Sequence, residues 1–244
     1  MPKRKTCKRN TDQARRAKRI QASRKKAKDA VLNKRYAYHE AGHAVLACIL
    51  REPFEYVSIE REKGTHGRLA RKLRPIREKR GLVERNGTFR LQVVGASAER
   101  QVEKRAIIMF AGIAAETALY KTFNDSSAGA QSDYDLAFQG AMELFRDEDV
   151  AADYVDYIQY RMIEIIMCAA VTTAVTAVAR RLLKKKRLTA KEVRSIVKPL
   201  AEGDWNLKRV VKHEKFNRER VADKVAIICA MKDAQPKGRR KRSG

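Results

Sequence analysis

The sequence predicts a mainly helical fold with a small β element of two or three short strands. Apolar residues recur at helical spacing through long segments, at 36–50, 97–120 and 151–185. Alternation of apolar and polar residues is confined to short stretches near residues 54–60 and 89–93. The chain has 244 residues, of which 44% are hydrophobic, which is enough for one sizeable core.

Composition divides the chain into four parts. Residues 1–35 form a basic arm, 36–200 the folded domain, 201–231 a helical extension and 232–244 a basic tail. The arm has fifteen Lys or Arg residues against Asp12 and Asp29, and its net charge of +13 is half of the +26 of the whole chain. The arm favours a helix but is polar on every side, so a helix there is marginal on its own.

Two interpretations of the basic arm and of the closing "KGRRKRSG" are open. They are solvated, disordered tails, or they attract nucleic acid, acidic proteins or an anionic membrane. The arm has almost no aromatic residues to stack on bases, so recognition of a nucleotide sequence is not expected.

The cysteines and the apolar runs favour a soluble, cytoplasmic protein. The four cysteines are far apart and form no CxxC pair, which suits a reducing compartment. The basic start is not followed by the apolar stretch of a signal peptide. The most apolar run, Ile165 to Ala179, is shorter than the ~20 residues of a membrane span and is expected to be a buried helix.

The first elements of the domain alternate between helix and strand. Residues 36–52 predict an apolar helix, and "FEYVSIE" predicts a strand with Val57 and Ile59 on one face. "KGTHG" is expected to be a glycine turn, and residues 70–88 are basic and irregular. Asn86-Gly87 signals a tight hairpin before a second short strand.

Helices fill the remainder of the prediction. A helix over 97–120 is followed by a loop at "NDSSAGAQ", after which Ser132 begins "SDYD", the form of a capping box. A long helical stretch over 151–185, with a break allowed, precedes a second capping box at "TAKE". A last helix is expected at 217–231.

The strongest motif is "HEAGH", from His39 to His43. Residues four apart share a helix face, so both histidines can bind one zinc ion, and Glu40 can act as general base on a water molecule activated by zinc. The other interpretation is a buried helix with two hydrogen-bonded histidines and a surface glutamate. Two of the four histidines of the chain lie here in an apolar helix, which favours metal, and Gly42 is expected to keep the adjoining surface open.

A catalytic zinc ion needs a third protein ligand, and spacing alone does not select one. Asp135 has a specific structural role as the partner of Ser132 in the capping box, whereas Asp133 has only a general preference for a helix N-terminus. The candidates are Glu116, Asp125, Asp133, Asp135, Glu143 and His66.

The order of five segments resembles the peptidase domain of FtsH-type zinc proteases. These segments are "AYHEAGHAVLA", "VSIEREKGTHGRL", "IIMFAGIAAETALY", "SAGAQSDYDLA" and "VARRLLKKKRLTAKEV", which together extend over 36–197. The resemblance implies a zincin-type helical domain with His39, His43 and Asp133 as zinc ligands and Glu40 as the base. It also implies that Glu116 orients a ligand.

The resemblance further implies that an extended substrate pairs with an edge strand at Val57, Ser58 and Ile59. The chain contains no G-x-x-x-x-G-K-[ST] loop, so the ATPase module, the membrane anchor and the hexamer of that family are not expected to carry over. The prediction is a soluble zinc metalloendopeptidase that acts on extended or unfolded polypeptides. The alternatives are a catalytically silent binding protein whose arms engage nucleic acid, and a peptidase subunit that receives substrate from a separate ATPase.

Overall fold

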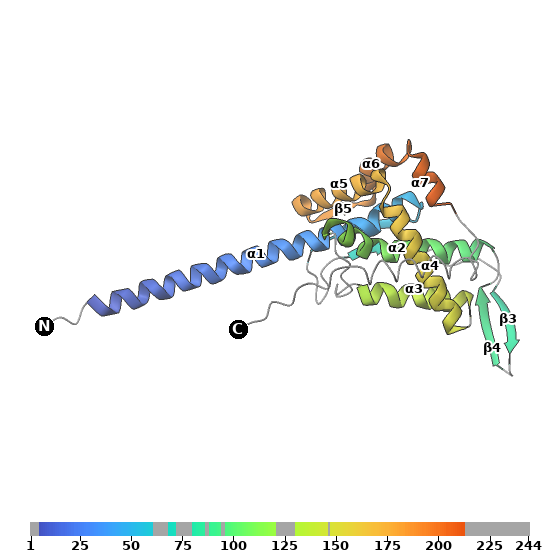
Figure 1. Ribbon diagram of the computed structural model, residues 1–244, viewed down its shortest axis with the longest axis horizontal. Helices are drawn as coiled ribbons and strands as arrows, with labels where there is room; N and C mark the ends of the chain where they lie inside the picture. Colours follow the sequence, from blue (N-terminus) through green and yellow to red (C-terminus); the bar gives the residue numbers. More distant parts are fainter. Residues whose placement is uncertain are drawn as a thin grey trace, which may run out of the picture.

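The computed structural model describes residues 5–60, 68–71, 80–85, 88–93, 96–120, 130–145 and 147–212. These residues form a mainly helical fold with a small three-stranded sheet and a separate two-stranded hairpin (Figure 1). The helices are α1 Lys5–Ile49, α2 Ala96–Tyr120, α3 Ala130–Leu144, α4 Glu148–Ile166, α5 Ala169–Lys185, α6 Ala190–Ala201 and α7 Trp205–Val210. The strands are β1 Phe54–Ser58, β2 Arg68–Arg71, β3 Arg80–Arg85, β4 Thr88–Val93 and β5 Arg187–Thr189.

Helix α1 contains both the basic arm and the "HEAGH" segment. Its 45 residues run without a break, so the predicted boundary after Arg35 lies inside a helix. Figure 1 shows the first part of α1 projecting away from the other helices. What changes along α1 is burial: nearly all residues from 18 to 34 are exposed, and most residues from Ala37 to Leu50 are buried.

The buried part of α1 packs against α2, α5 and α6, and α2 also contacts α3 and α4. Gly42 lies at the closest approach of α1 to α2, because a Cβ atom there would come 2.2 Å from the backbone oxygen of Ala111. The expectation that Gly42 keeps a surface open is therefore wrong. Its missing side chain instead allows two helix backbones to touch.

The apolar run from Ile165 to Ala179 is divided between two helices. Helix α4 ends at Ile166, and α5 begins at Ala169 after a bend of 84°. The helical stretch predicted over 151–185 is present and has the break that the prediction allowed, whereas the expectation of one buried helix over the apolar run is wrong. In the part of the chain that the structure describes, no single helix is long and apolar enough to cross a membrane; α4 and α5 together meet that test but are bent.

Strand β1 occupies the centre of the three-stranded sheet, which has the order β2-β1-β5. Val57 is opposite Leu69 on one side and Leu188 on the other, and the amide of Ile59 donates to the carbonyl of Lys186 at 2.9 Å. The prediction of a free edge at Val57, Ser58 and Ile59 is wrong. The cause is β5, which follows β1 by about 130 residues in sequence.

Strands β3 and β4 form an antiparallel hairpin with Arg85 opposite Thr88. The second predicted strand, near 89–93, is therefore confirmed, whereas the expectation of irregular structure throughout 70–88 is wrong at β3. The predicted turn residues, Asn86 and Gly87, lie outside the described residues, as does the "KGTHG" turn.

The two predicted capping boxes have different outcomes. Thr189 and Glu192 form theirs at the start of α6, where the Glu192 amide donates to the Thr189 hydroxyl at 3.3 Å and the Thr189 amide donates to Glu192 at 2.9 Å. The box at Ser132 is wrong, because α3 already begins at Ala130. Asp135 is exposed and instead accepts a hydrogen bond from Gln131 at 2.8 Å. The predicted helix at 217–231 and the tail lie outside the described residues.

Candidate metal centre

Helices α1 and α3 bring three metal-binding side chains together. His39 and His43 lie one turn apart on α1, and their Nε2 atoms are 3.0 Å apart. Asp133, in the first turn of α3, places Oδ2 3.3 Å from each of these nitrogens. Among the described residues, these three form a buried or half-buried group that could hold a metal ion.

The spacing of the three atoms fits a tetrahedral ion. Two ligands that each lie ~2.0–2.1 Å from one zinc ion are ~3.3 Å apart at the tetrahedral angle. The observed separations are 3.0, 3.3 and 3.3 Å. Asp133 Oδ2 is also a buried oxygen without a hydrogen-bond partner, an arrangement that costs free energy unless a cation satisfies it.

The Nδ1 atom of each imidazole contacts a hydrogen-bond acceptor outside the cluster. His43 Nδ1 is 2.6 Å from the carbonyl oxygen of Ile108, and His39 Nδ1 is 2.8 Å from Glu116 Oε1. A carbonyl and a carboxylate only accept, so both Nδ1 atoms donate and both Nε2 atoms face the cluster. This is the way in which metal-binding histidines are usually oriented.

Glu116 is itself fixed by an ion pair. Its Oε2 atom binds the Nε atom of Arg35, which lies one turn before His39 on α1. Glu116 is buried, and Arg35 is partly buried. The chain of contacts from Arg35 through Glu116 to His39 therefore joins α1 and α2 directly behind the cluster.

The electrostatics of the cluster favour positive charge. Burial works to lower the pKa of His39, but the carboxylates of Asp133, Glu116 and Glu40 outweigh it and raise that pKa to about 10. Burial works to raise the pKa of Asp133, but His43 and His39 outweigh it, and the pKa lies well below its ordinary value. The same carboxylates that favour a proton on His39 also favour a metal cation.

Gly112 leaves the space in which the two imidazoles sit. A Cβ atom at Gly112 would lie 2.5 Å from His43 Nε2 and 2.7 Å from His39 Nε2. The sequence prediction gave no role to this residue. The available signal was a glycine inside an apolar helical segment, four residues before Glu116, where glycine costs helix stability unless close packing requires it.

The remaining candidates are distributed as follows. Glu40 is buried beside His39, close enough for its charge to act on the imidazole. Asp135 and Glu143 are exposed on α3 and do not belong to the cluster. Asp125 and His66 lie outside the described residues. The geometry thus agrees with the ligand set that the resemblance implied and places Glu116 behind His39.

No protein-family model matches the chain, and no curated protein shows significant similarity to it.

Proposed function

We propose that the protein is a zinc-dependent metalloendopeptidase. The observation that carries the proposal is the convergence of His39 Nε2, His43 Nε2 and Asp133 Oδ2 at separations suited to one tetrahedral ion. Nitrogen ligands favour zinc over magnesium or calcium, which prefer sites built from oxygen atoms. The resemblance of residues 36–197 to FtsH-type peptidases supports the same reaction.

Each residue of the cluster has a distinct task. His39, His43 and Asp133 hold the ion, and Arg35 and Glu116 keep the imidazole of His39 in the required orientation. Zinc bound there supplies a Lewis acid that polarises a carbonyl group and makes a water molecule more acidic. The Glu40 carboxylate accepts the proton of the attacking water and passes it to the nitrogen of the leaving amine.

An extended polypeptide is the substrate class that the proposal favours, through addition of a strand to the small sheet. Since β1 is paired on both sides, such a substrate needs an outer strand. Within the described residues these are β2 and β5. Strand β2 contacts α1, the helix that carries the histidines, whereas the main helix contacts of β5 are with α5 and α6. The proposed substrate edge is therefore β2, Arg68–Arg71, in place of Val57–Ile59.

The Glu40→Gln substitution tests the mechanism. We expect zinc content, measured by mass spectrometry of the purified protein, to stay near one ion per chain, while casein cleavage is abolished. Glu143→Gln is the matched control, because Glu143 is an exposed glutamate on α3 outside the cluster, and it should leave both readouts unchanged. Wild-type cleavage should stop with a chelator.

The outcome separates the proposal from its rivals. Cleavage that survives in Glu40→Gln would falsify the role of Glu40. Zinc lost together with activity would make Glu40 a ligand and not a base. Wild-type protein that binds zinc but cleaves neither casein nor short peptides would indicate a silent binding protein. Cleavage of short peptides alone would indicate a subunit that needs a separate ATPase for proteins.

A further inference from the structure

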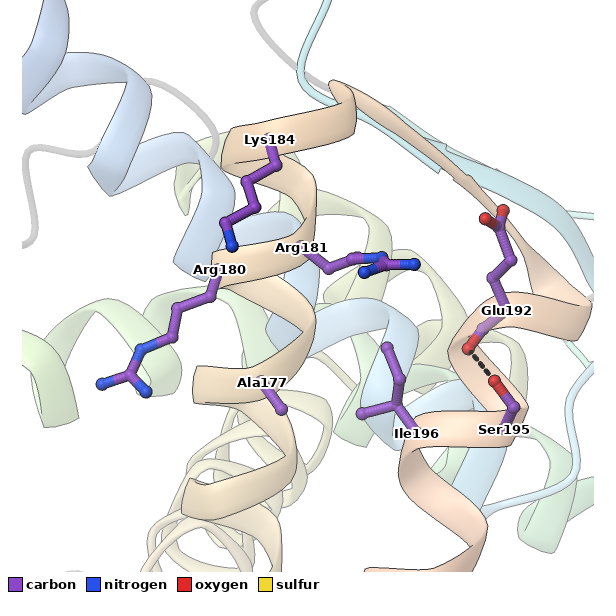
Figure 2. Close-up of a pocket in the computed structure, with 7 residues that line it drawn as sticks. All are labelled: Ala177, Arg180, Arg181, Lys184, Glu192, Ser195 and Ile196. Carbon is purple, nitrogen blue, oxygen red and sulfur yellow. Dashed lines mark hydrogen bonds between the residues drawn. The ribbon is translucent and has the colours of Figure 1, made fainter.

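A pocket lies between α5 and α6. Its volume is about 460 Å³. Figure 2 shows Arg181 extending from α5 toward α6, whereas Arg180 extends away from α6. The pocket is lined by Ala177, Arg180, Arg181, Lys184, Glu192, Ser195 and Ile196. None of these belongs to the metal cluster.

The cations of this pocket are not neutralised. Its one acidic residue, Glu192, is already engaged, because it binds Lys185 at 2.6 Å and accepts from the Thr189 amide and hydroxyl in the capping box. In the described part of the chain, Arg180, Arg181 and Lys184 have no acidic partner, and all three are exposed. The α5 side of the pocket therefore carries three positive charges without a described acidic partner, of which that of Arg181 extends toward α6 and that of Arg180 extends away from it.

The surroundings of the pocket are also basic. From Arg180 to Lys198 the sequence has nine Lys or Arg residues and a single acid, Glu192, for a net charge of +8. The exposed large hydrophobic residues of the described chain all lie elsewhere, at Ile20, Val31, Leu32, Leu136 and Met167. The α5–α6 surface thus carries a high density of positive charge, and the apolar residues that line its pocket are Ala177 and Ile196.

We propose that the α5–α6 pocket binds the phosphate backbone of a nucleic acid without reading its sequence. Phosphate contacts are made by Lys and Arg together, and arginine can bind phosphate oxygens through two N–H groups. A protein partner is disfavoured, because the centres of protein interfaces are depleted of lysine and enriched in aromatic residues.

Recognition of bases is not built into this surface. None of the residues that line the pocket is aromatic, and on the neighbouring sheet one face of the Tyr56 ring is covered by Arg187, whose guanidinium carbon lies 3.5 Å from the ring centre. The pocket therefore lacks the aromatic side chains on which the bases of single strands stack. No residue of α1 lines the pocket, so the pocket is distinct from the basic arm and does not depend on the proposed zinc chemistry.

The test measures binding of a fluorescein-labelled 20-nucleotide oligo-dT to the full-length protein by fluorescence anisotropy at several salt concentrations. Arg181→Gln combined with Lys184→Gln removes two pocket cations. Because each lost contact to single-stranded nucleic acid lowers the salt slope by about 0.7, we expect the log–log slope to fall by about 1.4 and the affinity to fall with it. A mixed-sequence oligonucleotide should behave in the same way.

Arg100→Gln combined with Lys208→Gln is the matched control. It removes one exposed arginine and one exposed lysine outside the pocket, so it makes the same change in net charge. We expect this control to keep the wild-type slope, and thermal melting to show that both variants are folded. Equal losses in both variants, or no loss in the pocket variant, would overturn the proposal. Tighter binding of a 20-residue polyglutamate peptide than of oligo-dT would overturn it in favour of an acidic protein partner.

Discussion

The two ends of α1 share one backbone and have opposite surroundings. In the exposed end, Ile20 is 46% accessible and Val31 is 59% accessible, whereas in the buried end Ala41 and Val45 are completely inaccessible. Both ends have helix-forming sequences, and no glycine or proline separates them. The difference is the presence of α2, α5 and α6 around the buried end, so packing and not helix propensity decides which part of α1 can carry a site.

The largest expected effect is at the buried end, when its partner on α3 is removed. Asp133→Ala should abolish zinc binding and casein cleavage, because His39 and His43 alone leave the ion short of the three ligands of a catalytic site. Asp135→Ala is the matched control. Among the described residues its exposed carboxylate binds Gln131, a pair with a free energy of ~0.2–0.5 kcal/mol, so zinc content and melting temperature should hardly change. Metal loss in Asp135→Ala alone would reverse the assignment.

Removal of the Glu116 carboxylate, which contacts His39 Nδ1, should have a smaller effect on zinc binding. Glu116→Gln weakens the hold on Nδ1 and leaves Arg35 without its carboxylate. Loss of such a hydrogen-bond partner typically lowers metal affinity by ~10–100-fold. We expect a decrease in this range, measured by competition with a chromogenic chelator. Glu143→Gln again serves as the control. Unchanged affinity in Glu116→Gln would mean that the contact to His39 is structural only.

Gly42→Ala tests whether packing outweighs propensity at the buried end. Alanine is the better helix former by ~1 kcal/mol, so propensity alone predicts a more stable protein. The Cβ atom would meet the backbone of Ala111 at 2.2 Å, and such overpacking costs ~1–3 kcal/mol, so we expect a lower free energy of unfolding in urea. Ala22→Gly is the opposite change, made in the exposed end of α1. It should not shift the urea midpoint of the main unfolding transition. Stabilisation by Gly42→Ala would contradict the packing of α1 on α2.

The same contrast explains what could be predicted from sequence. The spacing of His39 and His43 follows from local helix geometry, so the motif could be predicted from the sequence. The capping box at Thr189 could be predicted for the same reason. The third ligand depends on where α3 meets α1, about 90 residues away along the chain. Only the resemblance selected Asp133, and the local interpretation of Ser132 and Asp135 as a cap was wrong because α3 begins two residues earlier.

Contacts between distant segments account for the other corrections. The resemblance implies an edge strand at Val57 to Ile59, and the central position of this segment is due to β5, which no local pattern connects to β1. Gly42 and Gly112 are also meaningful only when a second helix is placed against them. Periodicity predicts which face of a helix is buried, but it does not predict which neighbour covers that face.

The smallest effect on catalysis is expected at the exposed end of α1. Deletion of residues 1–30 removes none of the cluster, and the described side chains of that segment are nearly all exposed. Cleavage of a short peptide should therefore keep its wild-type rate, and the melting temperature should change little. Binding to oligo-dT should weaken, because the deletion removes thirteen of the fifteen arm cations and each phosphate contact contributes to the salt dependence. The binding that remains should weaken further, with a salt slope lower by about 1.4, when Arg181→Gln and Lys184→Gln are added to the truncated protein. If the deletion lowers peptide cleavage at constant zinc content, the exposed end contributes to the site after all, and the division of α1 into a buried functional end and a separate basic end is wrong.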